Sequence, residues 1–202
     1  MLTRRTMTLA LASSALIPAA APAADDWRAK YKEIVFATVP AENASGVADR
    51  YAPFTDYLSR TLGVKVTLRI ASDYAAAIEG QRAGNIHIVY YGPASYVRAY
   101  TVTHGGVEPF VTTINSDGSI GYYSVAYVRA DDKATKLEDL KGRNLGLVDP
   151  NSTSGNNVPR YSLNKLGIEP DRFFSKVVYT GSHEIAVLAL KQGTVDGCFN
   201  WW

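Results

Sequence analysis

The chain has 202 residues, of which 47% are hydrophobic and 20% are charged. Apart from Arg4 and Arg5, which precede the first acidic residue, it carries 21 − 2 = 19 basic residues against 19 acidic ones. This balance excludes the basic stripe of a nucleic-acid-binding protein and a polybasic membrane-binding surface. The single cysteine, Cys198, excludes an internal disulfide, so the stability of the fold must come from packing.

Residues 1–24 are predicted to be a secretory signal peptide. Arg4 and Arg5 form its basic region, residues 7–17 form its apolar region, and Ala21-Pro22-Ala23 is a small-residue cleavage signal. The apolar region is too short to span a membrane. Thr3-Arg4-Arg5 matches a twin-arginine signal only in part, so both the Sec and the Tat export routes stay open.

Strand and helix patterns alternate in the first half of the remaining chain. The predicted strands cover 34–39, 64–70 and 86–90, and the predicted helices cover 47–62, 73–82 and 94–102. Gly63 and Gly84 are typical helix-ending residues, and Pro93 is favoured at the first position of a helix. This order indicates a parallel sheet with helices on both faces.

Two longer strands, 107–114 and 121–130, are predicted next, joined by a turn at 115–118. A second series follows: helix 137–142, strand 145–148, a helix up to Gly167, strand 176–179, helix 182–192 and strand 194–199. We therefore expect an α/β fold of two lobes, 25–125 and 126–202, each a mixed, mainly parallel sheet flanked by helices. Because the chain stops beside a predicted core strand, we also expect the second lobe to be incomplete and to expose apolar surface.

Ligands of open α/β sheets bind at the carboxyl ends of the strands. Ser152, Thr153 and Ser154 lie between a predicted strand and a predicted helix, where hydroxyls and free N–H groups suit an oxyanion. The same residue types also suit an ordinary N-cap. The other polar candidates at strand ends or on the connecting strand are Asn43, Tyr74, Tyr91, Tyr122 and His183.

Each candidate also has a structural interpretation. Tyr74 and Tyr122 suit packing aromatics, and His183 suits a helix-start histidine without a ligand. Glu184 suits complementation of a helix dipole, Asp196 a turn, and Cys198 a small core position. The three histidines show no metal-ligand spacing, and the sequence contains no P-loop or dinucleotide-binding glycine motif, so no metal or cofactor is predicted.

Several motifs in unbroken order resemble the phosphate/phosphite/phosphonate-binding proteins of bacterial ABC importers. They are Asp73-Tyr74-Ala75, Tyr91-Gly92-Pro93, Gly121-Tyr122-Tyr123-Ser124, the Leu-Glu-Asp-Leu-Lys-Gly of 137–142, the Asp-Pro-Asn-Ser-Thr-Ser-Gly of 149–155 and Gly181-Ser182-His183-Glu184. The resemblance implies a type II periplasmic binding protein whose lobes close on the ligand through the strands near 121–130. It implies a periplasmic location.

The resemblance also implies which residues bind ligand. It assigns the phosphorus oxyanion to Tyr74, Tyr122, Ser152, Thr153 and His183, with Ser154 assisting, and Asn43 and Tyr91 are further candidates. The implied partners are a small oxyanion and an inner-membrane permease and ATPase, and we expect a monomer without nucleic acid.

Two alternatives stay open. One is a sensory protein that presents an oxyanion to a membrane kinase; some relatives in this superfamily use a cysteine for arsenite, which keeps Cys198 of interest. The other is an enzyme on the same scaffold, with His183 as base and Ser152 or Cys198 as nucleophile, although no acid is placed beside His183 to orient it.

Overall fold

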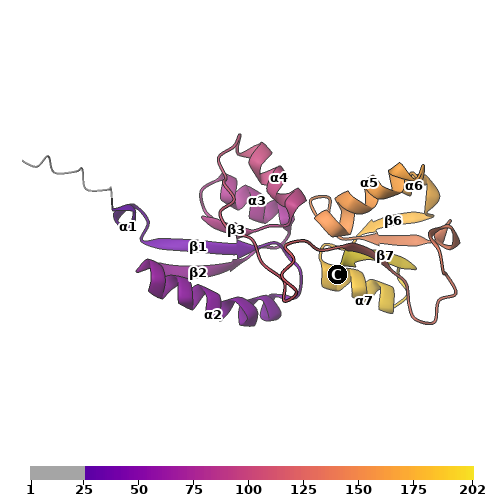
Figure 1. Ribbon diagram of the computed structural model, residues 1–202, viewed down its shortest axis with the longest axis horizontal. Coiled ribbons are helices and arrows are strands. Elements are labelled where there is room, and N and C mark those ends of the chain that lie inside the picture. Colours follow the sequence, from indigo (N-terminus) through magenta and orange to yellow (C-terminus); the bar gives the residue numbers. More distant parts are fainter. Residues whose placement is uncertain (1–25) are drawn as a thin grey trace, which may run out of the picture.

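Two β-sheets follow one another along the long axis of the molecule, each with helices on both sides (Figure 1). The computed structural model describes residues 26–202, so the predicted signal peptide lies outside the described residues. A short helix, α1 (Trp27–Lys30), precedes the first sheet. Within the described chain, no helix combines the length and the hydropathy needed to cross a membrane.

The first sheet has the order β2-β1-β3 and is parallel throughout. Its strands are β1 (Glu33–Thr38), β2 (Lys65–Ile70) and β3 (Ile88–Tyr90), and its helices are α2 (Ala44–Leu62), α3 (Tyr74–Arg82) and α4 (Pro93–Val102). Helix α2 lies on one face of the sheet, and α3 and α4 lie on the other (Figure 1). The predicted α/β arrangement of this lobe is therefore confirmed, with β3 shorter than expected.

The second sheet has the order β4-β7-β5-β6. Its strands are β4 (Ser124–Tyr127), β5 (Asn144–Leu147), β6 (Lys176–Tyr179) and β7 (Gly197–Trp201). Strand β5 is parallel to β6 and β7, and β4 is antiparallel to β7. The helical elements are the 3₁₀ helix η1 (Leu137–Leu140), the π-helical turn η2 (Thr153–Asn157), α5 (Val158–Lys165), α6 (Pro170–Phe173) and α7 (His183–Lys191). The mixed, mainly parallel sheet is as predicted.

The prediction of two long strands over 107–114 and 121–130 is wrong. Only Ser124–Tyr127 pairs as a strand, and Tyr123 adds one reciprocal pair of backbone hydrogen bonds with Trp202. Residues 107–114 join neither sheet, and their apolar side chains are open to solvent; Val111, for example, is 77% exposed. Alternating apolar residues form a strand only where a neighbouring strand accepts the backbone hydrogen bonds.

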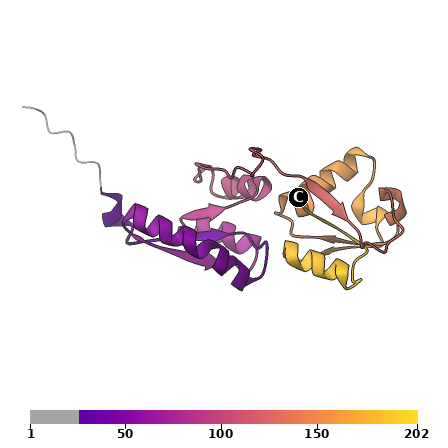
Figure 2. The same ribbon diagram turned by 60° about the horizontal axis from the view of Figure 1, so that its bottom comes forward.

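The carboxyl ends of the two sheets face each other across a shared apolar cluster. Val39 follows β1 and Val148 follows β5, and both belong to this cluster together with Tyr74 of α3, Ala186 of α7 and Cys198 of β7. Two further clusters lie within single lobes, around Phe36 of β1 and around Leu145 of β5. Figure 2 shows the two lobes next to each other along the molecule. The carboxyl ends of strands from both lobes therefore border one site.

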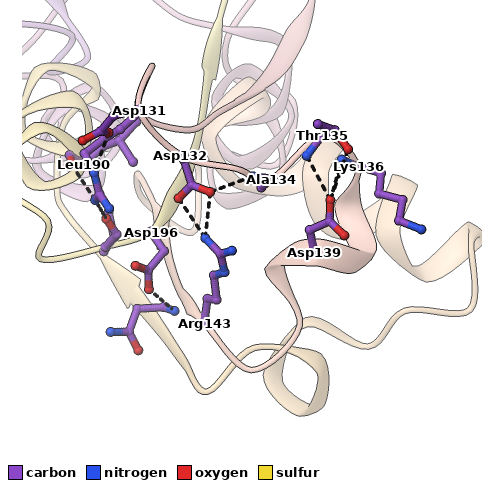
Figure 3. Close-up of polar contacts among 12 residues, drawn as sticks. Asp131, Asp132, Ala134, Thr135, Lys136, Asp139, Arg143, Leu190 and Asp196 are labelled. Carbon is purple, nitrogen blue, oxygen red and sulfur yellow. Dashed lines mark hydrogen bonds and ion pairs between the residues drawn. The ribbon is translucent and has the colours of Figure 1, made fainter.

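Polar contacts brace the end of the second lobe that lies away from the first (Figure 3). Arg143 donates to both carboxylate oxygens of Asp132, at 3.0 and 2.8 Å. Asp196 accepts the Asn144 N–H at 2.9 Å directly before β7, which confirms its predicted structural role at a strand end or turn. Arg129 donates to the carbonyls of Leu190 and Val195, both at 3.4 Å, and so binds the C-terminal end of α7.

The second lobe also presents apolar side chains to solvent, as expected from the sequence. Ile185 and Leu188 on α7 are 51% and 43% exposed, and Trp202 beyond β7 is 76% exposed.

Candidate functional site

The loop after β5 is folded tightly around Ser152. The Ser152 N–H donates to the Asp149 carbonyl at 2.9 Å, and the Ser152 hydroxyl accepts the Gly155 N–H at 3.1 Å. The Gly155 carbonyl in turn accepts the Val148 N–H at 2.9 Å. A side chain at position 155 would overlap Val148, so only glycine fits there. Ser152 is thus the N-cap of η2, and π-helical turns of this kind are frequent at functional sites.

Ser152 also connects the two lobes. Its Oγ lies 3.5 Å from Nε2 of His183, the first residue of α7, and its side chain lies near the Tyr74 hydroxyl. All three residues are buried, and Ser152 is only 1% exposed. The structure therefore brings together three of the predicted ligand residues, with Tyr74 from the first lobe and Ser152 and His183 from the second.

The electrostatics of this group favour neutral side chains. Burial raises the pKa of Tyr74 to about 12, against the opposing effect of the nearby Ser152 hydroxyl, and the Asp149 carboxylate adds to the increase. Burial lowers the pKa of His183. Nδ1 of His183 has no hydrogen-bond partner within residues 26–202. A neutral imidazole offers one donor and one acceptor, and the tyrosine hydroxyl can donate, so the group can bind both a charged and a protonated ligand oxygen.

A second group of predicted residues lies at the start of α4. The Thr153 hydroxyl accepts the Ala94 N–H at 2.8 Å, although the two residues belong to different lobes. A Cβ atom at Gly92 would lie 2.9 Å from Oγ1 of Thr153 and 3.2 Å from the Tyr122 hydroxyl. Helix α4 has no side-chain cap of its own, because Gly92 occupies its N-cap position. Thr153 therefore supplies an acceptor for this helix from the other lobe.

Next to this group is a hollow of about 210 Å³. Its lining residues come from both lobes and include Pro93, Ile120, Gly121, Tyr122, Ser124, Thr153, Ser154 and Val158. Tyr122 and Ser124 both line it. The Ser124 hydroxyl donates to the Ser154 carbonyl at 2.7 Å, which places the β4 strand against the Ser152 loop. The hollow is below the usual range for drug-sized ligands and suits a small one.

Asn43 and Tyr91, the two additional candidates, form no hydrogen bond with Ser152, Thr153 or His183 in the described chain. Asn43 is the N-cap of α2, and both its N–H and its side-chain amide donate to the Glu184 carboxylate. The Tyr91 side chain packs against the shared apolar cluster, and its hydroxyl is buried with no hydrogen-bond partner in the described chain. Burial raises the pKa of the Tyr91 hydroxyl.

The sequence did not reveal three features of the site. These are the Glu184 contact with Asn43, the Ala94 N–H as a donor, and the requirement for glycine at position 92. The first joins residues 141 positions apart, and no local pattern reports such a distance. The other two features lie in or next to the Tyr91-Gly92-Pro93 motif, but the motif does not indicate which residues they contact.

Cys198 is a core residue, as predicted. It is 1% exposed, and burial raises the pKa of its thiol to about 11, so the thiol stays protonated near neutral pH. Residues 26–202 contain no group of three or more His, Cys, Asp or Glu side chains placed to hold a metal ion.

Two α/β lobes with hydroxyls and an imidazole at the facing ends of their strands define a type II periplasmic binding fold. A family model described as "ABC transporter, phosphonate, periplasmic substrate-binding protein" matches residues 36–201, and the chain belongs to this family. The family resemblance read from the motifs is confirmed.

Curated relatives include the "Phosphate-import protein PhnD" of Mycolicibacterium smegmatis, 34% identical over 174 residues, covering 82% of this chain and 54% of the relative. The "Phosphonates-binding periplasmic protein" of Escherichia coli is 35% identical over 173 residues, covering 84% of this chain and 50% of the relative. The chain thus spans about half the length of the curated relatives it matches.

Solved structures of ABC-transporter binding proteins are also similar to this chain. A binding protein component of an ABC phosphonate transporter from Pseudomonas aeruginosa is 29% identical, with a TM-score of 0.76, and the match covers 84% of this chain and 57% of that one. PhnD1 of Prochlorococcus marinus, solved in complex with methylphosphonate, is 26% identical, with a TM-score of 0.73, and the match covers 83% and 63%.

Proposed function

We propose that this protein binds a tetrahedral phosphorus oxyanion, namely a phosphonate, phosphite or phosphate, between its two lobes. The observation that carries the proposal is the meeting of Tyr74, Ser152 and His183 from two lobes in one buried group. Tyr122, Thr153 and Ser154 border the adjoining hollow and would complete the ligand shell. Curated relatives named for phosphate import and phosphonate binding support the same ligand class.

The number of donors is sufficient for useful affinity. A hydrogen bond to a charged group contributes about 1.5–3 kcal/mol. Micromolar affinity requires about 8 kcal/mol, so four or five such contacts suffice even after the cost of ordering the site.

The protein would act as the substrate-binding component of an importer and deliver its ligand to an inner-membrane permease and ATPase. It would work in the periplasm as a monomer. We place its lobes at 25–125 and 126–202, with the boundary inside β4, and closure would bend the chain near 121–130. Catalysis has no place in this role, and burial keeps the Cys198 thiol protonated.

Isothermal titration tests the proposal most directly. The protein would be titrated with phosphite, methylphosphonate, phosphate and 2-aminoethylphosphonate, with sulfate as a tetrahedral control. We expect saturable heat with at least one phosphorus oxyanion and weaker heat with sulfate. Absence of heat with all four phosphorus ligands would overturn the proposal.

A further inference from the structure

The first turn of α7 is bonded to the opposite lobe through Glu184. The Asn43 N–H donates to Oε2 of Glu184 at 2.5 Å, and Nδ2 of Asn43 donates to Oε1 at 3.2 Å. The Glu184 N–H in turn donates to the Ala41 carbonyl at 3.1 Å. Three hydrogen bonds therefore join the loop after β1 to the start of α7, and two of them end on one carboxylate.

Asn43 is held in the orientation that this contact needs. Its Oδ1 accepts the Gly46 N–H at 2.9 Å and the Ser45 hydroxyl at 2.7 Å, so its amide cannot turn without losing the cap of α2. The fixed amide directs Nδ2 to the carboxylate. A carboxylate beside the N-terminus of a 19-residue helix is also stabilised by the helix dipole.

Glu184 follows directly after His183. Successive residues of a helix point in directions about 100° apart, so one turn can direct His183 to Ser152 and Glu184 to Asn43. Displacing the Glu184 side chain from Asn43 would therefore loosen the turn that carries the imidazole, which would keep the Glu184 N–H bond to Ala41 and the bond from Nδ2 of Asn200 to the His183 carbonyl.

We propose that Glu184 is a positioning residue that, through Asn43, holds His183 in the site and the two lobes in the arrangement that binds ligand. Other contacts cross between the lobes in the same arrangement: Tyr74 packs with Val148 in the shared apolar cluster, and the Ala94 N–H donates to the Thr153 hydroxyl. The ligand side of this inference rests on the proposed function. Glu184 itself need not touch the oxyanion.

The test uses Glu184→Gln, which keeps the shape of the side chain but places amide hydrogens opposite the donors of Asn43. Because one of the paired contacts is lost, the dissociation rate of methylphosphonate should rise about tenfold, equivalent to about 1.4 kcal/mol, while the association rate changes little. Stopped-flow kinetics measure both rates. Glu79→Gln is the matched control, because Glu79 pairs with Arg82 on an exposed part of α3, and it should leave both rates unchanged.

A reversed pair provides the rescue. In the double variant N43D/E184Q, the side-chain amide N–H of residue 184 can donate to the carboxylate of residue 43. The side-chain amide oxygen of residue 184 still accepts the backbone N–H of residue 43. In the N43D variant alone, the carboxylates of residues 43 and 184 face each other, so methylphosphonate should also dissociate faster. Recovery of slow dissociation in the double variant supports the proposal, since residues in contact are energetically coupled. Additive losses in the double variant would overturn it.

A readout without ligand separates this inference from the proposed function. Hydrogen exchange at the amides of Asn43 and Glu184 should speed up about tenfold in Glu184→Gln, as local opening becomes easier, and slow again in N43D/E184Q. If the wild-type protein binds no phosphorus oxyanion, the proposed function fails, and the inference is then judged on exchange alone. Unchanged exchange in Glu184→Gln would overturn the positioning role whatever the ligand results.

Discussion

Oγ of Ser152 lies 3.5 Å from Nε2 of His183, so the cap of one helical turn touches the first residue of another helix. The two residues follow different strands of the second sheet, and the Tyr74 side chain reaches the same hydroxyl from the first lobe. A single oxygen atom therefore takes part in the folding of a loop and in the proposed binding of an oxyanion.

Substitution Ser152→Ala should affect both roles. We expect ligand binding to weaken by about 1–3 kcal/mol, because a hydrogen bond to a charged group is lost. The free energy of unfolding should fall by about 0.5–2 kcal/mol, because the Gly155 N–H loses its cap. Titration calorimetry and thermal unfolding measure the two effects. Ser59→Ala, which removes a hydroxyl that accepts the Val66 N–H, should lower stability alone. A Ser152→Ala variant with lower stability and unchanged affinity would limit this residue to a cap.

Tyr91→Phe should change the stability of the protein, whereas Tyr74→Phe should change its affinity for ligand. The Tyr91 hydroxyl is buried without a partner in the described chain, and an unsatisfied buried group costs about 1–3 kcal/mol, so its removal should raise the melting temperature. Tyr74→Phe should instead reduce affinity, because it removes a donor next to Ser152. Chemical denaturation and ligand titration of both variants check this pair. Weaker binding by Tyr91→Phe would show that this hydroxyl contacts the ligand.

The stability of the ligand-free protein should fall in acid because of His183. Burial lowers the pKa of His183 in the folded protein below the ordinary value of 6.5, so between those two values the unfolded chain binds more protons. The stability that comes from the neutral imidazole is complete above pH 6.5 and is lost as the pH falls toward the folded-state pKa. Melting curves between neutral and acidic pH should show a steeper loss for the wild type than for His183→Gln. Equal slopes for the wild type and His183→Gln would show that the imidazole does not contribute.

Gly92→Ala should lower the affinity for ligand more than it lowers the stability of the fold. The added methyl group would meet Thr153 and the Tyr122 hydroxyl at 2.9 and 3.2 Å, so at least one of these side chains must move. We expect a loss of affinity of about 1–2 kcal/mol, typical of local overpacking. The melting temperature of the same variant reports the effect on folding. An affinity equal to that of the wild type would remove position 92 from the site.

The order of strands and helices could be predicted from the sequence because it depends on local patterns. Asp73 caps α3 and Ser182 caps α7, as polar residues before an apolar helical repeat indicate. The segment 107–114 could not be predicted in the same way. Its apolar alternation favours a strand, but strand formation depends on a neighbouring strand that the local sequence does not specify.

The candidate site could be predicted in part for the same reason. Tyr74, Ser152 and His183 follow strand ends, and the carboxyl ends of parallel strands meet at one edge, so the rule that found them is general. The partner of Asn43 depends on how two lobes pack. The sequence therefore predicts Asn43 as a further ligand residue, whereas the structure shows that its donors bind Glu184.

Helix α7 is held at both ends, by Glu184 and Asn43 at its start and by Arg129 at the carbonyls of Leu190 and Val195 at its end. In Figure 3 the Leu190 contact lies beside the ion pair of Asp132 and Arg143. The Arg129 contacts lie within the second lobe and fix the end of α7 when the chain folds, whereas the Glu184 contact joins the two lobes and fixes the start of α7 when they close. Part of the entropy of placing His183 is therefore lost before binding, and preorganisation of this kind helps a small anion with few atoms to reach a useful affinity.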